Sequence, residues 1–256
     1  MFMTRDEIDK SLELESSFFL PTEDGKKIFV LVNRAGETPS DKAIVIGHGL
    51  TGKPEDYLHM VARDYFNDRG YDVYRLAFYR DETGCRRLHE STLSIHAADL
   101  NAVLDHVRGN HKKLYVCGHS LGGLAMVFAT PQADAISFWD PSYQPSRRWL
   151  LTSTLSENGQ YYERTGRYRY TLGLAMIEEI RTFSHEAAQE MCRKISAPSQ
   201  ILIAGSSWLS EDPHMLFDDL VCEKEKYEIK GASHCFDTGK TVLELVEKTY
   251  QWFERF

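Results

Sequence analysis

The sequence contains no apolar run long enough to cross a lipid bilayer, although the chain has 256 residues. Residues 1–10 also lack the apolar centre of a secretory signal peptide. Membrane-spanning and secreted classes of protein are therefore not expected. We predict a cytoplasmic protein with no membrane span.

Cysteine is scarce, and its spacing does not match a metal site. The five cysteines are odd in number and stand at positions 85, 117, 192, 222 and 235. A chain of this length can bury enough apolar surface to fold without disulfides. We therefore expect reduced thiols, and the sequence implies no metal and no other cofactor.

Positive charge is not in excess either. The chain has 30 lysines and arginines against 38 aspartates and glutamates, which gives a formal net charge of -8 at pH 7. This balance does not favour nucleic acid as a partner. A composition of 42% hydrophobic and 27% charged residues is typical of a soluble globular protein. The length suits one large α/β domain or two small domains.

Short β-branched and aromatic runs alternate with amphipathic segments along most of the chain. The first two runs flank Asp24-Gly25, a strong signal for a hairpin turn. Strands are expected over residues 16–20, 27–33, 42–46, 71–77, 113–117, 133–139, 200–204 and 225–229, and helices over residues 57–69, from 91, 121–130 and 241–253. This α/β pattern predicts a mostly parallel eight-stranded sheet with an antiparallel N-terminal hairpin and helices on both faces.

One stretch breaks the alternation. Residues 142–195 show no strand pattern but contain helical pieces near 172–182 and 185–193. We predict a small helical cap there, inserted between two parts of the α/β core at residues 1–141 and 196–256. Such a cap would cover the C-terminal edge of the sheet, where open α/β sheets bind ligands. An ordinary helical excursion that covers no site is the alternative.

The segment Gly118-His119-Ser120-Leu121-Gly122 lies between a predicted strand and a predicted helix. G-x-S-x-G in that context is typical of a nucleophile elbow, a sharp turn that exposes the serine hydroxyl. The glycines leave room for the strained backbone of the turn. A simple Ser/Gly turn is the alternative for an isolated match, but the strand-turn-helix context favours a nucleophile.

Two further segments accompany this motif. Residues 46–50 (Ile-Gly-His-Gly-Leu) follow a buried strand, and His234 stands on a loop after the last strand. Together with the elbow, they resemble the α/β-hydrolase family over nearly the whole chain. The resemblance implies that the backbone N–H groups of Leu50 and Leu121 form an oxyanion hole. A phosphate loop is excluded at residues 47–53, because Pro54 replaces the Ser or Thr that it requires.

A serine hydroxyl needs a general base, because it is a poor nucleophile at neutral pH. The resemblance implies that His234 is this base, since the order Ser then His is that of the family. Of the 10 histidines, only His234 has this placement. We expect structural roles for His48 and His119, which flank the glycines of their turns.

The acid that orients His234 departs from the commoner family pattern. Many members carry an aspartate three residues after the glycine that ends the seventh strand, and here that position is Trp208. Asp140, which stands before a proline, is the preferred substitute, and Asp212 or Glu211 is the alternative. Each has a plain structural interpretation, as a turn residue for Asp140 and as helix-capping acids for the other two.

The predicted cap interleaves arginines with aromatic residues. We predict that Arg167, Tyr168 and Arg169 contact an anionic or aromatic part of the substrate. A solvated face or a subunit contact is the alternative. The other members of this pattern are Arg147, Arg148, Trp149, Tyr161, Tyr162, Arg164 and Tyr170.

These residues predict a serine hydrolase that cleaves carboxylic esters of small or medium acyl groups through an acyl-enzyme on Ser120. A serine at the elbow excludes the dehalogenases and epoxide hydrolases of this fold, which place an aspartate there. An acyl thioesterase or a non-catalytic binding module of the same fold is the alternative. The expected partner is a small-molecule ester or thioester, with a homodimer as a further possibility.

Overall fold

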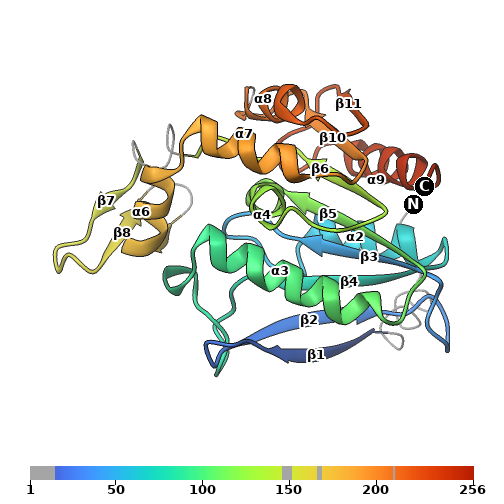
Figure 1. The fold of residues 1–256 in the computed structure, drawn as a ribbon, viewed down its shortest axis with the longest axis horizontal. Coiled ribbons are helices and arrows are strands. Elements are labelled where there is room, and N and C mark those ends of the chain that lie inside the picture. Colours follow the sequence, from blue (N-terminus) through green and yellow to red (C-terminus); the bar gives the residue numbers. More distant parts are fainter. Residues whose placement is uncertain (1–14, 146–151, 166–168, 210) are drawn as a thin grey trace.

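The computed structural model describes residues 15–145, 152–165, 169–209 and 211–256. An eight-stranded sheet lies at its centre, with helices on both faces and a smaller three-stranded sheet at one end (Figure 1). The predicted α/β class, strand number and N-terminal hairpin are confirmed. Within the described part of the chain, no helix is long and apolar enough to cross a membrane.

The large sheet has the order β1-β2-β4-β3-β5-β6-β10-β11. The strands β1 and β2 form the hairpin, and Gly25 takes the positive φ of 77° that its turn requires. From β4 onward, neighbouring strands are parallel. The strands are β1 (Glu15–Pro21), β2 (Lys27–Asn33), β3 (Lys42–Gly47), β4 (Tyr71–Ala77), β5 (Lys113–His119), β6 (Ala135–Trp139), β10 (Ser199–Ala204) and β11 (Lys224–Ile229).

Helices cover both faces of this sheet, and each face has its own apolar core. On one face lie α3 (Leu93–Arg108), α4 (Leu121–Ala129), α7 (His185–Lys194) and α8 (Asp212–Asp219). On the other lie α2 (Tyr57–Asn67) and α9 (Thr241–Phe253). The central strands are buried on both sides, which explains their continuous apolar sequences.

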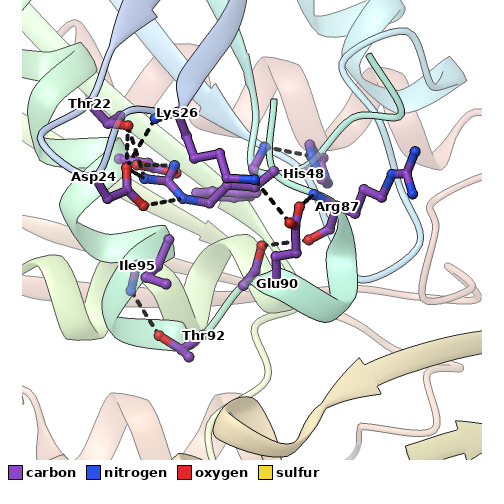
Figure 2. Close-up of polar contacts among 12 residues, drawn as sticks. Thr22, Asp24, Lys26, His48, Arg87, Glu90, Thr92 and Ile95 are labelled. Atoms are coloured by element: carbon purple, nitrogen blue, oxygen red, sulfur yellow. Dashed lines mark hydrogen bonds and ion pairs between the residues drawn. The ribbon is translucent and has the colours of Figure 1, made fainter. Parts of the chain in front are cut away.

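The N-terminal hairpin is tied to the segment that leads from β4 to α3. Arg86 in that segment pairs with Asp99 of α3 at 2.6 Å and with Asp24 of the hairpin turn at 2.8 Å. Figure 2 shows Lys26 beside Glu90, whose carboxylate accepts from the Lys26 ammonium at 2.9 Å. Thr92 caps the start of α3, because its hydroxyl accepts from the backbone N–H of Ile95.

The insertion differs from the helical cap expected over residues 142–195. It contains three short antiparallel strands, β7 (Thr154–Leu155), β8 (Tyr161–Arg164) and β9 (Tyr170–Gly173), before α6 (Leu174–Thr182). Gly159 has a positive φ of 69° in the turn between β7 and β8. Strands of two to four residues are too short to show a clear alternation of apolar and polar residues. The Asn158-Gly159 pair, which is typical of a hairpin turn, was the remaining sequence signal for them.

The last helix of the insertion belongs to the layer over the large sheet. Ala188 and Cys192 of α7 are buried in the same core as α4. Asp219 of α8 holds α7 in place, because it accepts from Gln189 at 2.8 Å and lies 2.6 Å from His185. The small sheet and α6 project beyond this layer at one end of the molecule (Figure 1).

Candidate active site

Ser120 joins β5 to α4 on a strained turn. Its backbone has φ 52° and ψ -112°, and its N–H donates to the carbonyl of Trp139 at 3.0 Å. A Cβ on Gly118 would lie 2.5 Å from the backbone of Gly122, and one on Gly122 would lie 2.4 Å from the carbonyl oxygen of Gly47. Both glycines are therefore required for the close approach of three backbone segments.

Alanine in place of Gly122 is expected to lower the free energy of unfolding by about 1–3 kcal/mol, because the new methyl must displace buried backbone. Gly109→Ala is the matched control, since Gly109 has no atom within 4 Å of its added Cβ. We expect that control to change stability by less than about 0.5 kcal/mol. Urea unfolding of both variants measures the difference, and equal losses would contradict a steric role for Gly122.

A chain of hydrogen bonds connects Ser120 to Asp140 through His234. Nε2 of His234 lies 3.0 Å from the Ser120 Oγ, and Nδ1 lies 2.6 Å from the Asp140 Oδ2. The other oxygen of Asp140 accepts from the backbone N–H of Ala204 at 3.1 Å. Since an ionised carboxylate only accepts, Nδ1 carries the proton and Nε2 is free to accept from the serine hydroxyl.

The two alternative acids lie elsewhere. Asp212 accepts from the backbone N–H groups of Tyr143 and Gln144 at 2.8 and 3.2 Å, and Glu211 is at the N-cap position of α8. Trp208 packs against His234 instead, with 5.1 Å between ring centroids and 58° between the ring planes. The structure therefore brings Asp140, and neither Asp212 nor Glu211, to the imidazole.

Two buried histidines hold the loops around Ser120. Nδ1 of His48 donates to the carbonyl of Gly49 at 2.8 Å, while its Nε2 accepts from the N–H of Phe78 at 3.1 Å. Nε2 of His119 donates to the carbonyl of His234 at 2.8 Å. Burial lowers the pKa of His48 to about 4 and that of His119 to about 3, so both are neutral at pH 7. Both have the structural roles expected of them.

The two N–H groups expected in the oxyanion hole lie on segments beside Ser120. Leu121 is the first residue of α4, where a backbone N–H has no acceptor within its own helix. Leu50 follows the loop held by His48, and it lines the same cavity as Ser120. The start of α4 therefore presents positive dipoles near the serine hydroxyl.

Ser120 and His234 open into a cavity of about 620 Å³. The small sheet supplies Arg164 and Tyr170 to its wall, and Nη1 of Arg164 lies 3.2 Å from the Tyr170 hydroxyl. Arg169 is exposed and does not line this cavity. Arg167 and Tyr168 lie outside the described residues.

Comparison with known proteins concerns the fold and part of the sequence. A family model described as serine aminopeptidase S33 matches residues 38–139. The esterase Est1E from Butyrivibrio proteoclasticus superposes with a TM-score of 0.74 at 18% identity, over 94% of this chain and 99% of its own. The chain has the α/β-hydrolase fold. The family match includes Ser120 and ends just before Asp140.

Two other similar structures with the α/β-hydrolase fold also align over nearly the whole length of both chains. The esterase domain of a Rhodothermus marinus protein has a TM-score of 0.73 at 16% identity, over 94% of this chain and 98% of its own. The mouse α/β-hydrolase domain-containing protein 10 has a TM-score of 0.73 at 15% identity, with 94% and 99% covered. No curated protein sequence matches the chain significantly.

Two hydroxyl groups at this site were not anticipated from the sequence. The Ser142 Oγ lies 3.4 Å from the Ser120 Oγ, and the Ser142 N–H donates to the Ser120 carbonyl at 3.1 Å. The Ser207 Oγ lies 3.4 Å from Nδ1 of His234. The position of Ser142, two residues after Asp140, was the sequence feature that could have indicated its place near Ser120.

Backbone strain in the described part of the chain is concentrated at this site. Among the described residues other than glycine, positive φ occurs at Thr51, Ser120, Thr130, Asp140 and Phe236. Ser120 and Asp140 belong to the hydrogen-bonded chain, Thr51 lines the cavity, and Phe236 lies two residues from His234. Such conformations are unfavourable, so the surrounding fold must hold these groups in place. Among the described residues, no group of His, Cys, Asp or Glu is arranged to hold a metal ion.

Proposed function

We propose that this α/β-hydrolase cleaves carboxylic esters of small or medium acyl groups, with Ser120 as the nucleophile. The observation that carries the proposal is the hydrogen-bonded chain from Ser120 through His234 to Asp140 at the cavity. The matched hydrolase family model supports a hydrolase. The esterases among the similar structures, including one of Est1E with ferulic acid bound, support an ester substrate.

In the first half of the proposed reaction, the Ser120 Oγ bonds to the ester carbonyl carbon while Nε2 of His234 takes the hydroxyl proton. The carbonyl oxygen becomes an oxyanion, which the N–H groups of Leu50 and Leu121 stabilise. The C–O bond to the alcohol then breaks, and His234 gives its proton to the departing oxygen. An acyl-enzyme on Ser120 remains.

In the second half, water attacks the acyl-enzyme carbonyl and gives a proton to Nε2 of His234. The bond to the Ser120 Oγ breaks, the same proton returns to that oxygen, and the carboxylic acid leaves. Asp140 contributes in both halves, because a buried carboxylate favours the imidazolium that forms twice. Its contact with Nδ1 also keeps the acceptor nitrogen directed at Ser120.

Labelling with a fluorophosphonate probe tests the nucleophile. We expect the wild-type protein to be labelled on the peptide that contains Ser120, and Ser120→Ala to remain unlabelled. Heat-denatured wild-type protein is the control, since it keeps every serine but loses the folded arrangement of Ser120, His234 and Asp140. A native protein that takes no label and hydrolyses no ester would instead favour a non-catalytic binding module.

The same residues could serve an acyl thioesterase, because thioesters react through the same acyl-enzyme. The kcat/KM values for p-nitrophenyl butyrate and butyryl-N-acetylcysteamine separate the two functions, since both substrates carry the same acyl group. We expect the ester to be hydrolysed with the higher kcat/KM. The reverse order would assign the protein to thioesters.

A further inference from the structure

Arg164 is a cation on the cavity wall, and no carboxylate of the described residues pairs with it. Among the described residues that line the cavity, it is the only lysine or arginine. Its side chain, on β8, is partly buried, and its Nη1 contacts the Tyr170 hydroxyl of β9 at 3.2 Å. Several other described arginines are paired with carboxylates, as Arg80 is with Glu55 at 2.8 Å. Within the described chain, no ion pair is formed by Arg164.

Two carboxylates line the same cavity, but both are bound within their own loops. Asp56 accepts from the backbone N–H of Lys53 at 2.9 Å, and Asp237 accepts from the hydroxyl of Ser233. Neither forms an ion pair with Arg164. The positive charge therefore faces the cavity without a counterion from the described walls.

We propose that Arg164, positioned by Tyr170, binds an anionic group of the ester substrate. This inference rests on the proposed function and adds a substrate class to it: esters that carry a carboxylate or a phosphate away from the reacting carbonyl. A guanidinium donates two parallel hydrogen bonds to either anion. In a partly buried cavity, this interaction is stronger than on the open surface. A neutral substrate would leave the cation unpaired.

The test for a carboxylate compares p-nitrophenyl hemiglutarate with p-nitrophenyl valerate, which has the same chain length and no charge. We expect Arg164→Gln to lower kcat/KM for the hemiglutarate by about 10- to 100-fold. The same variant should change the value for the valerate by less than about two-fold. Arg169→Gln is the matched control, because it removes an equal charge from outside the cavity, and neither value should change.

A second arm separates a carboxylate from a phosphate. Butyryl-coenzyme A carries phosphates and butyryl-N-acetylcysteamine carries none, while the acyl group is the same. A loss in Arg164→Gln confined to the coenzyme A thioester assigns a phosphate, and one confined to the hemiglutarate assigns a carboxylate. Equal losses for charged and neutral substrates, or no loss for any of them, would overturn the inference.

Failure of the inference is distinguishable from failure of the proposed function. If p-nitrophenyl valerate is hydrolysed but Arg164→Gln has no selective effect, only the anion site is wrong. If no ester or thioester is hydrolysed, the proposed function is wrong. Calorimetric titration with glutarate then tests the site by itself, and binding that is weakened in Arg164→Gln and retained in Arg169→Gln would support it. Undetectable binding to the wild type would refute it.

Discussion

Asparagine in place of Asp140 is expected to lower kcat for ester hydrolysis by about 10⁴-fold, with little change in the fold. The asparagine oxygen can still accept from the Ala204 N–H, as the aspartate does now. The amide nitrogen then faces Nδ1 of His234 and donates to it. Nδ1 must accept, so the proton moves to Nε2, where it blocks proton transfer from the Ser120 hydroxyl.

Asp212→Asn is the matched control for this prediction. Asp212 accepts from the backbone N–H groups of Tyr143 and Gln144, and an asparagine oxygen can accept them too. We expect kcat to stay within about ten-fold of the wild-type value. Steady-state hydrolysis of p-nitrophenyl butyrate measures both variants. A larger loss in Asp212→Asn than in Asp140→Asn would remove Asp140 from the mechanism.

Most of the core could be predicted from the sequence, because its local signals agree with the tertiary structure. The turn at Asp24-Gly25 sets the hairpin, and continuous apolar runs mark strands that are buried on both faces. The amphipathic pattern over Thr241–Phe253 predicts the bounds of α9 as observed. In each case, residues close together in the chain determine the element.

The acid could not be decided from the sequence, because its contact is not local. Asp140 and His234 are 94 positions apart, and their meeting depends on how β6 and β11 flank β10. Trp208 stands where many family members carry an aspartate, and this difference was the sequence signal that the acid lies elsewhere. With the carboxylate at the end of β6, position 208 needs no acid, and the Trp208 ring packs against the imidazole at a tilt instead.

The cavity wall shows a similar limit. The interleaved arginines and aromatic residues pointed to the right segment, but the strand register decides which side chains face the cavity. Arg164 and Tyr170 face it, whereas Arg169 is exposed. A shift of one residue along a strand moves a side chain to the opposite face of the sheet. Because the sequence did not predict strands in this segment, it could not show which side chains face the cavity.

Mild acid is expected to destabilise the protein, because four histidines are buried in neutral form. Burial lowers the pKa of His48 to about 4 and those of His59, His96 and His119 to about 3, from 6.5. Above pH 6.5, neither the folded nor the unfolded chain protonates them. As the pH falls below 6.5, the unfolded chain binds protons that the folded chain does not, and stability is lost until the pH approaches the folded pKa values.

One buried carboxyl opposes this trend. Burial raises the pKa of Asp99 to about 7, so the folded chain takes up this proton first and gains stability as the pH falls. Four histidines against one aspartate leave a net difference of three protons. We therefore expect the free energy of unfolding to fall by about 3 kcal/mol between pH 7 and pH 5.5. Urea unfolding at the two pH values measures it.

His96 isolates one of these protons, because neither of its ring nitrogens has a hydrogen-bond partner. In His96→Gln, the loss between pH 7 and pH 5.5 should shrink by about 1 kcal/mol, since one protonation site is gone. His106→Gln, which removes an exposed histidine of the same helix, is the matched control. The pH dependence, rather than the stability at pH 7, is the readout, because a buried glutamine carries its own cost. An undiminished loss in His96→Gln would mean that His96 is not buried in neutral form.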